Sequence, residues 1–160
     1  MRSNKQKGFS LIELLIVVAI ILIIAAIAIP NLLRSKMAAN EASSVATLRT
    51  YNTSIVAYQT TYGTAPSTNM SQLGPSSTPS STAADLVDNL LGVAAPSKSG
   101  YKFTYAPGAV VAGTISTYKI NADPLNYNTT GQRTFFTDQS GVIRQRTDGT
   151  AAAVTDTPIG

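Results

Sequence analysis

Residues 8–31 read GFSLIELLIVVAIILIIAAIAIPN, and this stretch decides the fold. The apolar run inside it extends from residue 9 to residue 29 and is interrupted by a single charge, that of Glu13. A run of about 20 apolar residues is long enough to cross a bilayer as an α-helix. The sequence therefore predicts a membrane-spanning helix over residues 9–30.

The residues before this run are short, polar and basic. Residues 1–8 read MRSNKQKG and look like a leader peptide. By the positive-inside rule, basic residues on the N-terminal side of a span keep that end in the cytoplasm. Arg34 and Lys36 on the far side are a weaker signal in the opposite direction. We therefore expect a single-pass protein whose C-terminal part is exported.

A second helical segment is predicted over residues 31–63. Pro30 lacks a backbone donor, so we expect a kink there or a break with a restart at Asn31. Beyond it, apolar residues recur at helical spacings of three and four with a gap at Glu41, and Gly63 is a plausible stop. These apolar positions are Met37, Val45, Leu48, Tyr51, Ile55, Tyr58 and Tyr62.

The rest of the chain, residues 64–160, is predicted to hold a loop, a short helix and a sheet. Residues 64–82 are rich in Ser, Thr and Pro and predict an exposed loop. A short helix is expected over residues 82–92, capped by Thr82 and Asp85, with leucines on its apolar face. Strands are expected at 101–105, 114–121, 133–138 and 142–146, with a hairpin turn at 138–141 and a loose tail after residue 149.

These elements predict an α+β fold, in which a small antiparallel sheet packs against the amphipathic half of a long helix. Composition narrows the function further. The chain has no cysteine and no histidine, which excludes disulfides, thiolate sites and histidine-based catalysis. Its eight acidic residues form no evident pair, so we do not expect an enzyme. Three of the charges behind the net +4 lie in residues 1–8, so no specific nucleic-acid surface is expected either.

Gly8, Phe9 and Glu13 are the residues on which the functional prediction depends. A carboxylate inside a membrane helix costs free energy and therefore requires a partner. Cleavage after Gly8 would create one, because the new α-ammonium group of Phe9 would lie one helical turn from Glu13 of its own or a neighbouring chain.

The stretch over residues 8–31 resembles the prepilin signature of type IV pilins and of the pseudopilins of type II secretion systems. The resemblance implies cleavage between Gly8 and Phe9 by a membrane aspartyl peptidase, followed by N-methylation of Phe9. It also implies that Glu13 serves processing and subunit registration, and that Pro30 kinks or locally melts the helix in the filament.

The resemblance further implies the partners and the location of the protein. The expected function is that of a structural subunit of a type IV pilus-like filament, a helical homopolymer. The implied partners are a prepilin peptidase, an inner-membrane assembly platform and, before assembly, membrane lipid. The chain would begin in the bacterial cytoplasmic membrane and end in a periplasmic or cell-surface filament. Because residues 135–144, FFTDQSGVIR, are similar to the C-terminal hairpin of G-type pseudopilins, a pseudopilin or a minor pilin is the alternative.

A calcium ion is a weaker expectation. Members of this family often close the C-terminal region with a disulfide, which this chain cannot form, and some pseudopilins use calcium instead. Asp123 and Asp138 are the candidate ligands, with Asn121, Asn126 and Asn128 near the first of them. The spacing is not that of an EF-hand loop, and Asn and Asp are also ordinary turn residues. We therefore expect no cofactor and keep calcium as the minor alternative.

Two plainer interpretations of the N-terminus stay open. Ala26-Ile27-Ala28 has the form of an ordinary signal-peptide cleavage site, which would release a secreted soluble binding domain beginning at Ile29. A plain membrane anchor would give Gly8 and Glu13 no role. The long apolar run and the charge within it favour the prepilin interpretation over the signal peptide. The amphipathic helix that follows directly favours it over the anchor.

Overall fold

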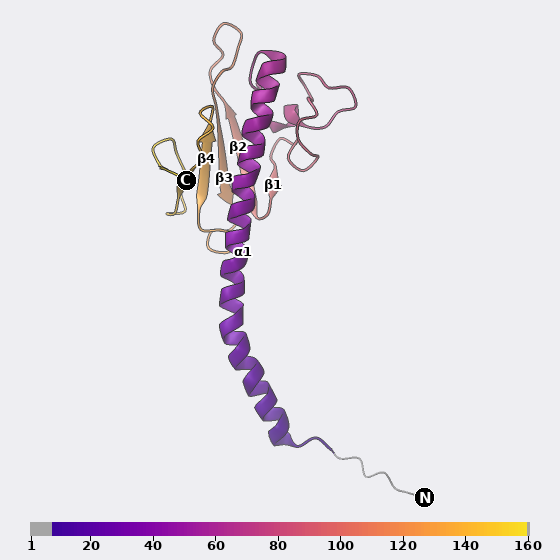
Figure 1. The fold of residues 1–160 in the computed structure, drawn as a ribbon, viewed down its shortest axis with the longest axis vertical. Helices are drawn as coiled ribbons and strands as arrows, with labels where there is room; N and C mark the ends of the chain where they lie inside the picture. Colours follow the sequence, from indigo (N-terminus) through magenta and orange to yellow (C-terminus); the bar gives the residue numbers. More distant parts are fainter. Residues whose placement is uncertain (1–7, 160) are drawn as a thin grey trace, which may run out of the picture. The chain divides into compact units, whose positions relative to one another are not determined.

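The computed structural model describes residues 8–159, and it confirms the predicted α+β fold class. The chain divides into two compact units, Met1–Ser35 and Lys36–Gly160. The helix α1 spans Leu11–Tyr62 and contributes residues to both. The predicted leader, residues 1–8, lies outside the described residues except for Gly8. The other elements, drawn in Figure 1, are η1 (Met70–Leu73), β1 (Ser97–Lys98), β2 (Tyr101–Pro107), β3 (Tyr118–Pro124), β4 (Thr134–Asp138), β5 (Arg144–Arg146) and β6 (Thr157–Pro158).

The N-terminal unit consists of the first part of α1 and the residues before it. Pro30 lies inside the helix, and the predicted break with a restart at Asn31 does not occur. A proline removes one backbone hydrogen bond, and here the bonds of the neighbouring turns keep the helix continuous. In the described chain, α1 is the one helix that is long and apolar enough to cross a membrane, and its most apolar window is entirely unburied.

In the C-terminal unit the strands form a six-stranded antiparallel sheet in the order β1-β2-β3-β4-β5-β6. In the register, Ile120 of β3 lies between Tyr105 of β2 and Thr137 of β4. The four predicted strands are present. The second begins later than predicted, at Tyr118, because Val111 and Thr114 bond to each other in a turn within the β2–β3 connection. The two-residue strands β1 and β6 were not predicted.

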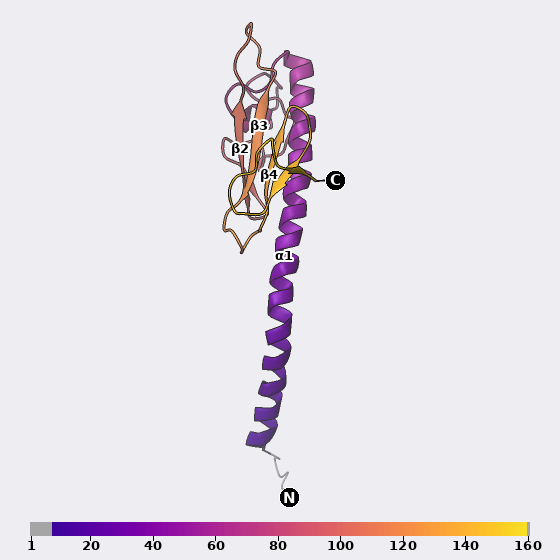
Figure 2. The same ribbon diagram turned by 90° about the vertical axis from the view of Figure 1, so that its left-hand side faces the viewer.

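The core lies between one face of α1 and one face of this sheet, and Figure 2 shows the sheet along one side of the helix. The predicted apolar stripe is confirmed in its C-terminal part, where Leu48, Tyr51, Ile55 and Tyr58 are buried. The ring of Tyr51 meets that of Phe103 edge to face, with 5.7 Å between centroids. Alternate residues of the strands complete the core: Tyr101, Phe103, Tyr118, Ile120, Ala122 and Phe135. The predicted helix stop is also confirmed, since Gly63 has a φ of 74°.

The αβ-loop, residues 63–96 between α1 and the sheet, is more ordered than its composition indicates. Within the stretch predicted to be exposed, Ala65, Met70 and Leu73 are fully buried in the core. The loop is also held by hydroxyl groups of α1, because the Oγ of Ser54 donates to the carbonyl of Leu86 over 3.1 Å. A Ser/Thr/Pro-rich composition therefore coexists here with three apolar anchors.

The prediction of a helix over residues 82–92 is wrong. The segment is a series of turns, and its expected capping partner Asp85 has a φ of 54°, outside the right-handed helical region. Asp88 bends the chain a second time. Its Oδ1 accepts the backbone N–H groups of Leu90 and Leu91 over 3.1 and 2.8 Å. A short polar side chain that bonds to nearby backbone in this way competes with helix formation.

The hairpin turn at residues 138–141 is confirmed, whereas the tail after residue 149 is not loose. The tail returns to the sheet as β6, which pairs with β5. Ala152 is buried, and its carbonyl accepts a 2.8 Å hydrogen bond from Nδ2 of Asn121. The guanidinium of Arg146 donates hydrogen bonds from Nε and Nη2 to the carboxylate of Asp156 over 2.9 and 2.7 Å. Paired guanidinium–carboxylate bonds of this kind fix geometry as well as adding energy.

We predict that the contribution of this ion pair to stability disappears in acid. The hydrogen bonds from Arg146, with that from the backbone N–H of Ala153, lower the pKa of Asp156. A carboxyl whose folded pKa is depressed stabilises the fold above its ordinary pKa of about 4 and loses that effect as the pH falls through the folded value. Asp156→Asn should therefore lower the melting temperature of the detergent-solubilised chain at pH 7, with the gap to wild type narrowing below about pH 4. A gap that stays constant down to pH 2 would contradict the assignment.

Glu41 explains the gap in the apolar stripe of α1. Its side chain is buried and reaches the start of β4, where Oε2 lies 2.8 Å from Nε of Arg133. Its other oxygen accepts the backbone N–H groups of Gln132 and Arg133 over 2.8 and 3.1 Å. One carboxylate thus satisfies a guanidinium and two backbone donors, and it joins the helix to the sheet.

Glu41→Ala should destabilise the C-terminal unit by about 2–3 kcal/mol. That is at or below the low end for breaking a buried ion pair, because the Arg133 side chain keeps 38% of its solvent exposure. Glu41→Gln, which keeps an acceptor for the backbone donors, should lose less. Denaturant unfolding followed by the near-ultraviolet circular dichroism of the buried tyrosines measures both. Equal losses in the two variants would show that the backbone bonds contribute nothing.

Candidate functional site

The predicted cleavage site lies on exposed, non-helical chain. Gly8, Phe9 and Ser10 precede α1 and belong to no helix or strand. Phe9 is 80% exposed, and apart from the two chain neighbours of Gly8 no described residue has a heavy atom within 4 Å of the position that a Cβ on Gly8 would occupy. The Gly8–Phe9 peptide bond is therefore accessible in the conformation of the described chain.

Glu13 lies at the first turn of α1 and folds back toward this segment. Its Oε2 accepts the backbone N–H of Ser10 over 2.8 Å. Ser10 immediately precedes the helix and Glu13 is its third residue, so this bond is one half of a capping box. The Ser-x-x-Glu spacing was visible in the sequence, and it is a role for Glu13 that the sequence analysis missed.

The four predicted N-terminal site residues do not form one cluster. Gly8, Phe9 and Glu13 lie within the first turn of α1 and just before it. Pro30 follows Glu13 by almost five helical turns, about 25 Å along the axis. Its effect on the helix is consequently separate from the chemistry around the cleavage site.

The surface of α1 in the N-terminal unit is apolar all round. Large apolar side chains with about half or more of their surface exposed occupy every face of this part of the helix. They are Leu11, Ile12, Leu14, Leu15, Ile16, Val17, Val18, Ile20, Ile21, Leu22, Ile23, Ile24, Ile27, Ile29, Leu32 and Leu33. Such a helix is stable only where lipid or other protein covers it.

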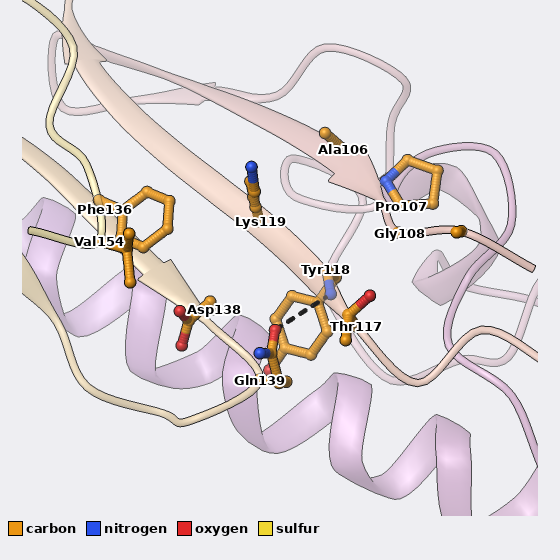
Figure 3. Close-up of a pocket in the computed structure, with 11 residues that line it drawn as sticks. Ala106, Pro107, Gly108, Thr117, Tyr118, Lys119, Phe136, Asp138, Gln139 and Val154 are labelled. Carbon is orange, nitrogen blue, oxygen red and sulfur yellow. Dashed lines mark hydrogen bonds between the residues drawn. The ribbon is translucent and has the colours of Figure 1, made fainter.

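A hollow of about 420 Å³ lies on the C-terminal unit and is lined by several polar side chains. Figure 3 shows Lys119, Asp138 and Gln139 along it, with Phe136 and Val154 at one end. Asp138 is engaged in the hairpin turn, where Oδ1 accepts the backbone N–H of Ser140 over 2.9 Å. Burial, with the nearby Asp138, raises the pKa of Tyr118 to about 12, so its phenol stays protonated. These side chains offer no nucleophile activated by a base.

The two calcium candidates lie apart. In the sheet, Asp138 of β4 is opposite Lys119 of β3. Asp123 lies four residues beyond Lys119 in β3, about 13 Å further along that strand, and is opposite Lys102 of β2. Burial raises the pKa of Asp123, and Lys102 opposes that shift. Among residues 8–159, no three His, Cys, Asp or Glu side chains are grouped closely enough to hold a metal ion. Asp123 and Asp138 therefore share no site in this structure.

Comparison with known proteins bears on the N-terminal site. A family model described as the prokaryotic N-terminal methylation motif matches residues 3–29. The type IV wide pilus major component PilA4 of Thermus thermophilus is 60% identical to this chain over 38 residues. That match covers 24% of this chain and 29% of PilA4, less than a third of either protein. No solved structure is a significant match to the chain.

The matched motif is the stretch that holds Gly8, Phe9 and Glu13, and the likeness is to a filament component, which points to a structural protein. The long apolar helix and the antiparallel sheet have the layout expected of a pilin. On these grounds the chain carries the N-terminal signature of the type IV pilin family.

Proposed function

We propose that the chain is a structural subunit of a type IV pilus-like filament and has no catalytic activity of its own. The observation that carries the proposal is the combination of an accessible Gly8–Phe9 bond, a carboxylate one turn further on, and an apolar helix exposed on every face. The name of PilA4, a major component of a wide pilus, supports the same role.

Processing follows from the position of Gly8 and Phe9. A prepilin peptidase hydrolyses the amide between them, which releases residues 1–8 and leaves an α-ammonium group on Phe9, and that group is then N-methylated. In the precursor, Oε2 of Glu13 accepts the N–H of Ser10. After cleavage the same carboxylate has a cation within one helical turn, on its own or a neighbouring subunit.

Assembly replaces lipid with neighbouring helices around α1. Exchange of one apolar environment for another costs little, whereas an unpaired carboxylate in that environment costs several kcal/mol. In the filament interior, the ammonium of Phe9 and the carboxylate of Glu13 therefore stabilise each other as an ion pair. The C-terminal unit, whose apolar core is already closed, supplies the exposed surface of the filament.

The proposal implies a route through the cell. The precursor is a single-pass protein of the bacterial cytoplasmic membrane, with lipid around α1 and its N-terminus inside. The prepilin peptidase and an inner-membrane assembly platform act on it there, and the mature chain leaves as a periplasmic or cell-surface homopolymer.

We predict that the mature protein begins at Phe9 and carries one additional methyl group. Mass spectrometry of the N-terminal peptide from the membrane fraction measures both properties. An N-terminus at Ile29 would instead identify an ordinary signal peptide and a secreted soluble binding domain. Retention of residues 1–8 would identify a plain anchor.

Glu13→Ala should reduce filament yield by about tenfold or more, because it leaves the Phe9 ammonium without its anion in an apolar interior. The variant should still fold and insert into the membrane. Filament counts by electron microscopy, normalised to membrane-bound subunit, measure the effect. Asp148→Ala is a control that removes an exposed carboxylate from the C-terminal unit. Normal filaments from Glu13→Ala would refute the pairing.

A pseudopilin of a type II secretion system, or a minor pilin, is the second candidate. The observation in its favour is the hairpin formed by β4, the turn at residues 138–141 and β5, which contains the stretch similar to G-type pseudopilins. A filament visible on the cell surface at native expression favours the pilin.

A further inference from the structure

The end of the C-terminal unit at which α1 enters carries a surface that is separate from the N-terminal site. Two connections between strands meet there, the β1–β2 turn and the β3–β4 connection. The basal surface, as we term it, consists of Lys36 of α1, Lys98 of β1, and Leu125 and Tyr127 of the β3–β4 connection. Lys36 is the first residue of this unit.

Hydrogen bonds place both connections against the first turns of α1 in this unit. Nδ2 of Asn40 donates to the carbonyl of Thr130, in the β3–β4 connection, over 2.8 Å. The hydroxyl groups of Ser43 and Ser99 lie 2.9 Å apart, so the β1–β2 turn adjoins the same part of the helix. Figure 1 shows these connections at the lower end of the sheet, beside α1. The basal surface is therefore the side of the unit that adjoins the incoming helix.

The β3–β4 connection holds apolar surface outward in a fixed conformation. Leu125 is 54% exposed, and its backbone N–H donates to the carbonyl of Gly100 over 2.9 Å. Tyr127 is 40% exposed, and its hydroxyl donates to the carbonyl of Thr147 over 2.6 Å. A leucine and an amphipathic tyrosine are thus presented together on an ordered connection.

The charge on the basal surface is positive. Lys36 is exposed and Lys98 is half-buried, and neither forms an ion pair within residues 8–159. The carboxylates toward this end each have a basic residue beside them: Arg133 beside Glu41, Lys102 opposite Asp123, and Arg146 beside Asp148. The two lysines are therefore left to attract an anion from outside the chain.

We propose that the basal surface rests on the lipid headgroups of the exported-side leaflet before the subunit is assembled. Leu125 and Tyr127 enter the headgroup layer, and the ammonium groups of Lys36 and Lys98 bind the phosphates of anionic lipids. This inference rests on the proposed membrane-inserted precursor, and it adds a contact between the C-terminal unit and the bilayer.

The short distance along α1 favours lipid as the occupant. Lys36 follows Pro30, the end of the predicted span, by six residues, which is a rise of about 9 Å in a helix. The headgroup layer on each side of a bilayer is about 5–7 Å thick. Membrane helices tilt by about 20° on average, which brings one side of an attached unit closer to the lipid. The basal surface therefore begins near the outer edge of the headgroups.

The residue types also match a headgroup layer. Tyrosine is enriched where membrane meets water, because its ring is apolar and its hydroxyl is polar. Lysine can lay its methylene stem along apolar groups while its ammonium stays among phosphates. Each lysine near an anionic leaflet shifts the balance between bound and free by only about fivefold. Such a contact holds the C-terminal unit near the bilayer and still releases it when α1 leaves the membrane.

Fluorescence quenching in vesicles tests the contact with the full chain. Thr129→Cys places a single thiol at an exposed position of the β3–β4 connection, because the chain has no native cysteine. The labelled variant is reconstituted at low density into vesicles of phosphatidylcholine and phosphatidylglycerol that carry nitroxide headgroups in both leaflets. The nitroxides should quench this label several times more strongly than a label on the control variant, Val110→Cys.

Val110 is a matched control because it is also exposed but lies at the other end of the sheet. It is 65% exposed in the β2–β3 connection. That connection adjoins the end of α1 at Tyr62, since the backbone N–H of Ile115 donates to Oγ1 of Thr64 over 2.9 Å. Equal quenching of the two labels would overturn the contact and leave the proposed function intact.

Two further outcomes identify the cause of any failure. If the chain does not float with the vesicles, it is not inserted, and the proposed function fails together with the contact. If quenching of the Thr129→Cys label disappears when the chain is diluted further in lipid, contact with the bilayer depends on a second copy. That result would overturn a contact made by a single subunit, while the proposed function would stand.

Substitutions within the basal surface separate its apolar and charged parts. Leu125→Ser in the Thr129→Cys background should weaken quenching in vesicles with or without phosphatidylglycerol. Lys36→Gln should lower the bound fraction by up to about fivefold in vesicles that contain phosphatidylglycerol, and it should have no effect in phosphatidylcholine alone. High salt should mimic the lysine variant, because it screens exposed charges. Unchanged quenching in both variants would overturn the proposal.

Discussion

The exposed apolar surface of the first part of α1 is the constraint on which the rest of this protein depends. Burial of a single leucine or isoleucine side chain contributes about 1.5–3 kcal/mol, and all of those in this part of the helix are left open. The backbone of a helix satisfies its own polar groups, so lipid and neighbouring helices are both acceptable surroundings. The C-terminal unit must then build its core from one face of the later part of α1 and from the sheet. It does so with Tyr51, Ile55 and Tyr58, which belong to one buried cluster with Phe103 and Phe135.

The parts of the fold that could be predicted from the sequence are those set by local chemistry. Spacings of three and four placed Leu48, Tyr51 and Ile55 on one helical face, and alternation placed Tyr101 and Phe103 on one face of a strand. Gly63 and Gly141 mark a helix end and a hairpin turn because both require a positive φ. The stretch that the N-terminal methylation motif matches was predictable for the same reason, since Gly8, Phe9 and Glu13 lie within six consecutive residues.

The features that escaped prediction depend on partners distant in the sequence. Glu41 interrupts the apolar stripe because it pairs with Arg133. That pairing was not predicted because the two residues lie 92 positions apart along the chain. The tail is ordered because Asp156 meets Arg146 and Ala152 meets Asn121, and no local pattern encodes either contact. The prediction for the αβ-loop failed for a different reason. Apolar periodicity at Leu86, Leu90 and Leu91 predicted a helix, but the Asp88 carboxylate accepts the backbone N–H groups of Leu90 and Leu91 and holds a turn there.

Apolar helices alone specify little about how neighbouring subunits are arranged. Attraction between apolar surfaces is non-directional, so apolar helices packed side by side could slide or rotate against one another at small cost. The pair proposed between the Phe9 ammonium and the Glu13 carboxylate would resist sliding along the helix axis, because the two groups must stay within one helical turn of each other. Charged groups beside an apolar contact reject wrong partners and registers more than they add affinity.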